Sequence, residues 1–324
     1  MHLLEIKNVN IAYKTGNKKV KAVRNVSLTI DEQESVGIVG ESGSGKSTLA
    51  MGILRLLPEN IIEVSGEALL EGKDIFQMSD KELHECRWKT MSVIFQKAMN
   101  SLSPVHRIGK QMEDIYRVHY PDESNENIKN RIYELLKIVN LSERVYTSYP
   151  HELSGGMMQR VAIALSLIFS PKLLIMDEAT TALDVVTQSQ ILNEIMELEK
   201  KMKIARIMIT HDVSVVASTC KRVVVMYAGE LMEQGDVKDV LLNPQHPYTQ
   251  GLLNSFPSFK GERGNLKGIE GSLPDLSRPL EGCVFADRCP HACERCFKEK
   301  PKQHEVGDRW SVSCHLSEGG KQHD

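Results

Sequence analysis

The chain has 324 residues, enough for two domains, and its hydrophobic content of 41% and charged content of 26% are ordinary for a soluble globular protein. Its formal net charge of -3 gives no global electrostatic reason to expect binding to nucleic acid or to an anionic membrane surface. No segment approaches the roughly 20 apolar residues that span a bilayer, and the N-terminus has no signal-peptide apolar core, so we expect a cytoplasmic protein.

The first part of the chain predicts strands followed by a helix. Leu4–Val9 and Val26–Ile30 alternate apolar and polar residues at strand spacing, and Ser35–Val39 is typical of a short buried strand. After a glycine-rich segment, Leu49–Leu54 has the apolar pattern of one helix face.

The glycine-rich segment between that strand and that helix fits the phosphate-binding pattern G-x-x-x-x-G-K-[ST] without a mismatch. Its glycines let successive backbone N–H groups curl around phosphate oxygens, and the following helix adds its dipole. Lys46 can reach the β- and γ-phosphates, and the Ser47 hydroxyl can bind Mg²⁺. The residues predicted to hold the nucleotide are Gly40, Glu41, Ser42, Gly43, Ser44, Gly45, Lys46, Ser47 and Thr48.

The middle of the chain predicts a helical insertion and a second anion site. Ile128–Val139 has helical periodicity, with Ser124 as its N-cap, and indicates a helical subdomain over about residues 97–160. Residues 154–156, Ser-Gly-Gly, open a predicted helix over Met157–Phe169. A second helix start suited to phosphate is surplus unless it serves a nucleotide bound to a different subunit.

The buried strand Leu173–Met176 ends in Asp177 and Glu178. Ligands of open parallel sheets lie beyond the carboxyl ends of the strands, so these carboxylates are expected near the phosphate loop. We expect Asp177 to hold Mg²⁺ and Glu178 to polarise the attacking water.

Further elements follow in alternation. Asp184–Met202 predicts a helix, Ala205–Ile209 a buried strand, and Arg222–Tyr227 with residues 229–232 a hairpin. Buried strands that alternate with helices indicate an α/β fold with a parallel-rich sheet and helices on its faces.

Together the motifs resemble the ATP-binding subunits of ABC transporters through about residues 3–255. The segments that carry the resemblance are Gly40–Thr48, Gln96, Leu153–Arg160, Asp177-Glu178, Ala182–Asp184 and His211. It implies an α/β P-loop ABC ATPase domain over residues 1–255, with a parallel-rich sheet core, antiparallel N-terminal strands and an inserted helical subdomain. It also implies hydrolysis of ATP to ADP and phosphate, in a head-to-tail dimer with two ATP molecules between the subunits.

The resemblance assigns roles to individual residues. Tyr13 would stack on adenine, Gln96 would contact Mg²⁺ and the attacking water, and His211 would contact the γ-phosphate. The implied catalytic residues are Glu178, His211, Lys46 and Gln96, and the implied Mg²⁺ ligands are Ser47, Gln96 and Asp177. The residues implied to act across the dimer are Ser154, Gly155, Gly156 and Gln159, on the ATP of the partner subunit, and Asp184, at the interface.

Five of the seven cysteines lie in a proline-rich tail, residues 256–324, for which we expect a small loop-rich domain. In a reducing cytoplasm such clustering favours a metal over disulfides, and four thiolates suit either Zn²⁺ or a [4Fe–4S] cluster. Asn243–Pro257, Gly282–Ala292 and Ser313–His315 resemble segments of dipeptide and oligopeptide importer ATPases, whose tails hold an iron–sulfur cluster. The ligands that this resemblance implies are Cys283, Cys289, Cys296 and Cys314, with Cys293 as the spare cysteine.

The resemblance therefore implies the ATPase subunit of a bacterial importer for dipeptides or oligopeptides, peripheral on the cytoplasmic face of the membrane. The implied partners are a second ATPase subunit, either a copy or a paralogue, two membrane permeases and, indirectly, an extracytoplasmic peptide-binding protein; no nucleic acid is expected. The alternatives are a nickel or defence-peptide transporter subunit, or a soluble ABC ATPase that acts on ribosomes or DNA. A single nucleotide-binding domain and the lack of a basic patch argue against the last.

Overall fold

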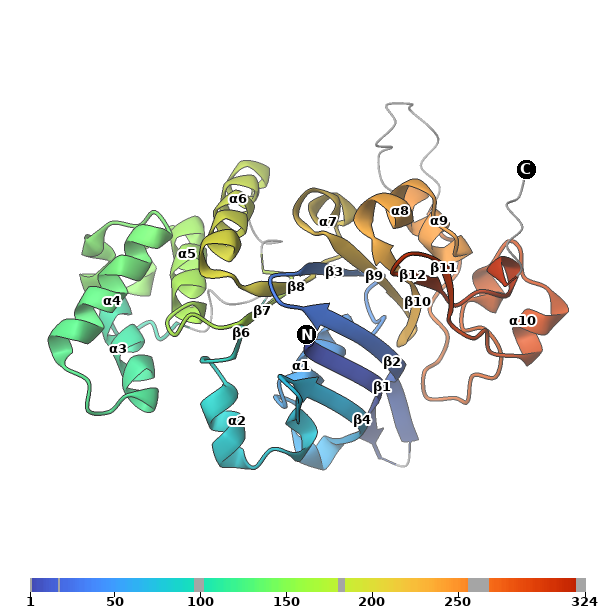
Figure 1. The fold of residues 1–324 in the computed structure, drawn as a ribbon, viewed down its shortest axis with the longest axis horizontal. Helices are drawn as coiled ribbons and strands as arrows, with labels where there is room; N and C mark the ends of the chain where they lie inside the picture. Colours follow the sequence, from blue (N-terminus) through green and yellow to red (C-terminus); the bar gives the residue numbers. More distant parts are fainter. Residues whose placement is uncertain (1, 17, 96–101, 180–183, 256–267, 319–324) are drawn as a thin grey trace. The chain divides into compact units, whose positions relative to one another are not determined.

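The computed structural model describes residues 2–16, 18–95, 102–179, 184–255 and 268–318, drawn in colour in Figure 1. They divide into two compact units. The larger unit comprises His2–Ile30, Ser35–Gln77 and Met208–Asp324, and the smaller unit comprises Asp31–Glu34 and Met78–Ile207.

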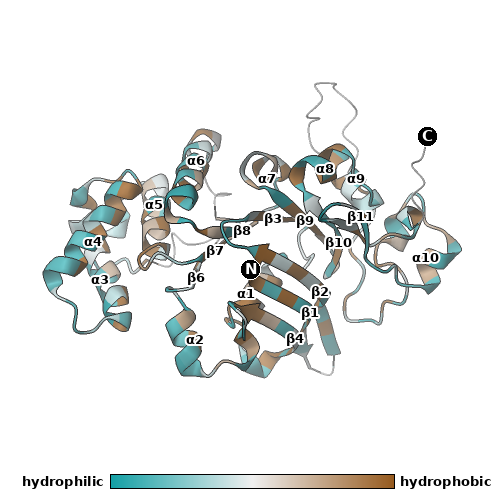
Figure 2. Cartoon of the chain, viewed as in Figure 1, coloured by the Kyte–Doolittle hydropathy of each residue, from teal (hydrophilic) through white to brown (hydrophobic). Residues whose placement is uncertain are grey.

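The N-terminal strands of the larger unit form an antiparallel sheet in the order β2-β1-β4-β5. Its strands are β1 (His2–Thr15), β2 (Lys18–Asp31), β4 (Ile62–Leu70) and β5 (Lys73–Asp74). Leu4 pairs with Leu70 and Tyr13 with Ile62 across β1 and β4. Buried and partly exposed residues alternate from Val26 to Ile30, and Figure 2 shows alternating hydropathy along these strands. The predicted antiparallel strands are thereby confirmed.

A second run of strands in the larger unit begins at the strand before the phosphate loop. Its strands are β3 (Ser35–Val39), β9 (Arg222–Tyr227), β10 (Glu230–Asp236), β12 (Trp310–Val312) and β11 (His304–Gly307). β3 and β9 are parallel and buried throughout. β10 pairs antiparallel with β9 and β12, and β12 pairs antiparallel with β11, so two tail strands continue this sheet.

The helices of the larger unit are short, and the tail shares their core. They are α1 (Lys46–Ile53), α7 (Val213–Thr219), α8 (Val237–Leu242), α9 (Pro247–Asn254) and α10 (Glu294–Lys298). Phe285 of the tail is buried among Val39, Tyr227 and Tyr248 in one apolar cluster. A separate cysteine-rich domain, as the sequence predicts, is therefore not confirmed.

The smaller unit pairs two parallel strands, β6 (Met91–Ile94) and β7 (Leu173–Asp177), with a set of helices. The helices are α2 (Asp80–Cys86), α3 (Ile108–His119), α4 (Asn125–Ile138), α5 (Gly155–Ser166) and α6 (Val185–Met202). α3 and α4 lie side by side in Figure 1. Ser124 caps α4, as predicted, by accepting a hydrogen bond from the Asn127 N–H. β8 (Ala205–Ile209) runs from the smaller unit into the larger one.

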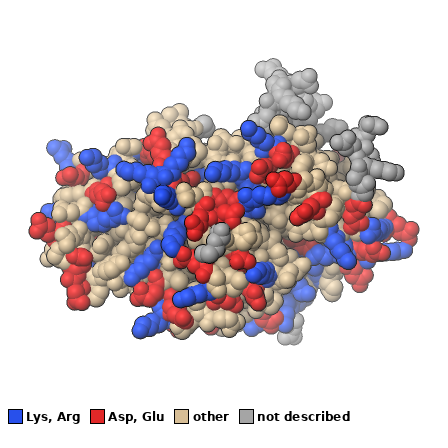
Figure 3. Space-filling model, in the orientation of Figure 1, with Lys and Arg blue, Asp and Glu red and all other residues tan. Residues whose placement is uncertain are grey.

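Charges of both signs are interspersed on the face drawn in Figure 3. In the part of the chain that the structure describes, no helix is long and apolar enough to cross a membrane.

Candidate active site

The phosphate loop runs from the end of β3 to the start of α1. Gly40, Gly43 and Gly45 have φ angles of 149°, 82° and 96°, in the region that favours glycine. A Cβ at Gly40 would lie 2.1 Å from the Met226 carbonyl oxygen, and one at Gly45 would lie 2.2 Å from that of Ala22. The loop therefore packs so closely on its neighbours that these two positions admit only glycine.

The ammonium group of Lys46 lies inside this loop. Its Nζ donates to the carbonyl oxygens of Gly40 and Glu41, at 2.8 Å each, and to Ser44 Oγ at 3.1 Å. The residue is 6% exposed. The loop thus surrounds a buried positive charge with backbone at the start of a helix, an arrangement suited to an anionic group.

Tyr13 lies beside the helix that the loop begins. Its hydroxyl is 3.2 Å from Thr48 Oγ1 in the first turn of α1. The structure therefore brings Tyr13 next to the predicted nucleotide loop, although stacking on adenine stays a prediction.

The predicted carboxylates occupy the carboxyl end of β7. Asp177 is 7% exposed, and Glu178 is half-buried with a φ of 49°, an uncommon conformation for a residue with a side chain. Because β6 and β7 are parallel, with Ile94 opposite Met176, the residues that follow both strands leave the same edge. Gln96, which follows β6, lies outside the described residues.

The second predicted anion site is at the start of α5. Ser154 caps this helix, accepting a hydrogen bond from the Met157 N–H at 3.3 Å. A Cβ at Gly156 would lie 3.1 Å from Thr187 Cγ2 in the first turn of α6. That helix is capped by Asp184, whose pKa is lowered by hydrogen bonds from the backbone and side chain of Thr187. The structure therefore places the signature segment and Asp184 together within the smaller unit.

His211 is exposed and lies two residues after the end of β8, in the larger unit with the phosphate loop. Asp212, the next residue, caps α7 by accepting from the Ser214 N–H at 2.9 Å. The predicted contact of His211 with a γ-phosphate stays a prediction.

The tail cysteines differ in exposure. Cys296 and Cys314 are buried, Cys283 and Cys289 are partly buried, and Cys293 is exposed. Burial, with a smaller contribution from the thiols of Cys296, Cys314 and Cys289, raises the pKa of Cys283 to about 12. The four implied ligands thus share one neighbourhood. Within the described ranges, however, no group of three or more His, Cys, Asp or Glu side chains is arranged to hold a metal ion.

Sequence analysis missed two residues that contact the phosphate loop, Tyr248 and Arg288. The Glu41 N–H donates to Tyr248 Oη at 2.9 Å, and Arg288 Nη1 donates to Glu41 Oε2 at 2.9 Å. Tyr248 and Arg288 lie in Asn243–Pro257 and Gly282–Ala292, the two segments that resemble peptide importers. Neither residue belongs to a phosphate-binding pattern, so their position in these segments was the signal that could have pointed to a functional role.

Two protein families match the chain. Residues 23–181 match the ABC transporter family, and residues 232–296 match the C-terminal region of oligopeptide/dipeptide transporters. The chain belongs to the ABC transporter ATP-binding family. The predicted resemblance is confirmed, and this ABC ATPase is also similar to curated proteins over nearly all of its length.

Three of these relatives show the extent of the similarity. An oligopeptide transport ATP-binding protein, OppD, of Bacillus subtilis is 44% identical, over 97% of this chain and 88% of that protein. A dipeptide transport ATP-binding protein, DppD, of Caldanaerobacter subterraneus is 39% identical, over 98% of each. A probable peptide ABC transporter ATP-binding protein of Sinorhizobium fredii is 42% identical, over 96% of this chain and 94% of that protein.

Solved structures agree with the family. A dimeric structure of the ATP-binding cassette MJ0796, bound to ADP and Pi, has a TM-score of 0.65 and 31% identity, over 72% of this chain and 98% of that one. The structure of cbiO1 from Clostridium perfringens, part of the ABC transporter complex cbiONQ, has a TM-score of 0.63 and 28% identity, over 75% of this chain and 91% of that one. The chain has the ABC ATPase cassette fold, with mixed sheets, and is an ATPase that binds ATP with Mg²⁺.

Proposed function

We propose that this chain is the ATP-hydrolysing subunit of an importer for dipeptides or oligopeptides. The observation that carries the proposal is the match of residues 232–296 to the oligopeptide/dipeptide transporter region. The peptide-transport names of the relatives favour peptides over nickel, defence peptides, ribosomes or DNA.

In this proposal, the phosphate loop binds ATP, and residues that follow the strands β7 and β8 take part in its hydrolysis. The loop N–H groups and Lys46 bind the phosphates of ATP, and Tyr13 stacks on its adenine ring. Glu178 accepts the proton of the attacking water, and His211 contacts the γ-phosphate. The residues that would hold Mg²⁺ are Ser47, Gln96 and Asp177, and the bound ion would neutralise charge on the phosphates.

We further propose that the site is completed by a second ATPase subunit arranged head to tail. Ser154, Gly155, Gly156 and Gln159 would then contact the ATP of that partner, and Asp184 would lie at the interface. Two observations support this: the capped start of α5 offers backbone donors, and the buried Gln159 Nε2 has no hydrogen-bond partner among the described residues. The dimer would work with two membrane permeases at the cytoplasmic face of the membrane, and indirectly with an extracytoplasmic peptide-binding protein.

For the tail we propose a [4Fe–4S] cluster, with Zn²⁺ as the alternative, held by Cys283, Cys289, Cys296 and Cys314. Their donor chemistry and shared burial fit such a group, and the exposure of Cys293 suits a spare cysteine. When bound, the cluster would supply cross-links that staple a loop-rich segment, which we place at residues 256–324, after the ABC domain of residues 1–255.

The test is reconstitution with the two permeases and the peptide-binding protein that this proposal calls for. In proteoliposomes, dipeptides or oligopeptides should stimulate ATP hydrolysis and enter the lumen, and a Lys46→Ala complex should do neither. Stimulation by Ni²⁺ in place of peptides would overturn the peptide assignment and leave the ATPase assignment intact. Co-purification with ribosomes or DNA in place of permeases would overturn the transport assignment.

A further inference from the structure

Glu41, the second residue of the phosphate loop, is held at three different atoms. Its N–H donates to Tyr248 Oη at 2.9 Å, and its carboxylate accepts from Arg288 Nη1 at 2.9 Å. Its carbonyl oxygen accepts from Lys46 Nζ at 2.8 Å and from the Ser44 N–H at 3.1 Å. Because the ammonium of Lys46 rests on this carbonyl, the position of Glu41 helps to set the position of the charge that binds phosphate.

The guanidinium of Arg288 is buried and multiply bonded. The side chain is 7% exposed and leaves the short 3₁₀ turn Ala286–Arg288. Besides Glu41, it donates to Tyr227 Oη at 3.1 Å and to the carbonyl oxygens of Ile269 and Glu270 at 3.0 and 2.8 Å. A planar group that satisfies four acceptors at once fixes the geometry of each, and lysine cannot reproduce this pattern.

Tyr248 contacts the phosphate loop from α9. It is buried at the start of α9, and its ring packs against Tyr227 and Phe285 at centroid distances of 4.6 and 5.3 Å. Its N–H donates to His246 Nδ1 at 2.9 Å, which fixes the turn that carries it. Burial raises the pKa of Tyr248, so its hydroxyl remains neutral and can accept the Glu41 N–H.

We propose that Arg288 and Tyr248 are positioning residues of the ATPase: they hold Glu41, and through it the phosphate loop and Lys46, in the shape that receives ATP. Neither residue needs to touch the nucleotide. Their loss lets the loop adopt other shapes, so ATP must select the competent one, and its apparent affinity falls by the fraction that remains competent.

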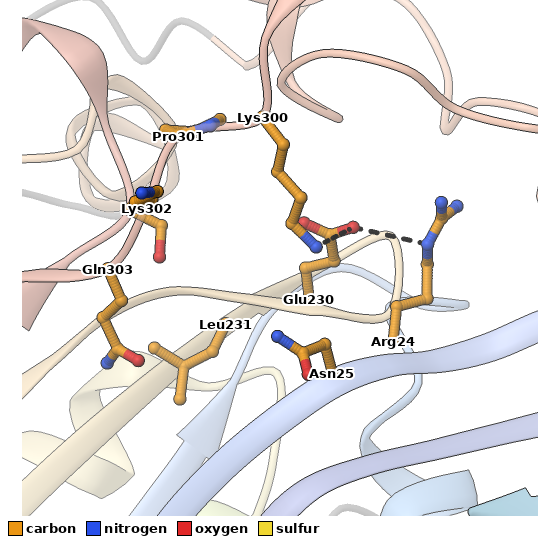
Figure 4. Close-up of a pocket in the computed structure, with 9 residues that line it drawn as sticks. Arg24, Asn25, Glu230, Leu231, Lys300, Pro301, Lys302 and Gln303 are labelled. Carbon is orange, nitrogen blue, oxygen red and sulfur yellow. Dashed lines mark ion pairs between the residues drawn. The ribbon is translucent and has the colours of Figure 1, made fainter.

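A second ion pair of the tail provides a matched control. Lys300 Nζ lies 2.9 Å from Glu230 Oε1, and Arg24 Nε lies 3.3 Å from the same oxygen. Figure 4 shows the two cations reaching Glu230 from either side, in a pocket that the phosphate loop does not line. Lys300→Met therefore removes an ion pair between tail and cassette without removing a contact of Glu41.

The experiment measures ATP affinity of the purified full-length subunit by direct titration, and kcat and KM in the assembled transporter. Arg288→Met should raise the Kd of ATP about tenfold, the size expected for one buried charge-assisted hydrogen bond. KM should rise in parallel, while kcat at saturating ATP stays within about twofold, since chemistry at Glu178 is untouched. Tyr248→Phe, which removes one oxygen and keeps the packing, should raise the Kd about threefold to tenfold. Lys300→Met should leave the Kd unchanged.

A double variant tests the route through Glu41. Glu41→Gln weakens the same ion pair, so Arg288→Met combined with it should raise the Kd little more than Arg288→Met alone. Wild-type affinity in both Arg288→Met and Tyr248→Phe would overturn the proposal, as would equal weakening in Lys300→Met. Where Arg288→Met fails to fold, Tyr248→Phe decides, and wild-type affinity in that variant overturns the proposal by itself.

Discussion

Two glycines of the phosphate loop leave no room for a side chain. At Gly45 both the φ of 96° and the Ala22 carbonyl oxygen, 2.2 Å from an added Cβ, oppose alanine. Gly45→Ala should therefore shift the loop off its neighbours and weaken ATP binding by about tenfold or more, measured by titration. Gly72→Ala is the control, because Gly72 has a φ of 81° but open space around it. It should lower the free energy of unfolding by about 1 kcal/mol and leave ATP binding intact.

Glu178 directly follows β7, and its role as the general base is a proposal that a single substitution can test. Glu178→Gln keeps the shape of the side chain but cannot accept a proton from water. The steady-state rate of ATP hydrolysis should fall by about 100-fold or more, with ATP binding retained. Glu197→Gln, on an exposed position of α6, should hydrolyse ATP normally. Normal turnover by Glu178→Gln in the assembled complex would remove Glu178 from the catalytic role.

At the scale of single residues, the sequence was most informative where a motif fixes backbone geometry. The pattern around Lys46 identified the loop, and the structure supplies the backbone contacts that explain Gly40 and Gly45. Tyr248 and Arg288 could not be predicted, since each acts through a contact with a residue more than 200 positions away. Pattern reading detects local spacing, and such pairs become neighbours only through the fold.

At the scale of helices and strands, the turn before α9 makes the folding stability of the protein depend on pH. Burial lowers the pKa of His246 to about 3, and its Nδ1 caps α9. The unfolded chain therefore binds one more proton than the folded chain between about pH 3 and the ordinary histidine value near 6.5. As the pH falls through this window, stability is lost at up to about 1.4 kcal/mol per unit.

His246→Asn tests this, because asparagine retains a capping acceptor and does not titrate. Its free energy of unfolding, measured in denaturant between pH 7 and 5, should fall less steeply than that of the wild type. His151→Asn, at an exposed histidine, should keep the wild-type slope. An unchanged slope in His246→Asn would show that His246 already titrates normally in the folded protein.

The helices and strands could be predicted most closely where all residues of a strand are buried. The strands over 35–39 and 205–209 have the expected bounds, and the helix predicted over 157–169 begins at Gly155 and ends at Ser166. The tail strands β11 and β12 were not predicted. They are short and partly exposed, and pairing with β10 makes them strands rather than any pattern of their own.

At the scale of the whole molecule, the metal content of the purified protein tests the proposed cluster of the tail. Protein purified without oxygen should contain about four irons and four sulfides per chain. Cys296→Ser should lose them, because Cys296 is buried, whereas Cys293→Ser should keep them, because Cys293 is exposed although the two sulfurs lie 3.4 Å apart. Elemental analysis that finds one zinc and no iron would reject the cluster. If Cys293→Ser lost the iron and Cys296→Ser kept it, the third ligand would be Cys293 in place of Cys296.

The pairing of β12 with β10 also bears on how this chain could be shortened. Removing the tail would expose one side of β10, a seven-residue strand with buried residues along most of its length. Such an uncovered edge is a template for another strand. A cassette trimmed after residue 255 would therefore be prone to associate edge to edge with its own copies, so the tail also serves as a guard against aggregation.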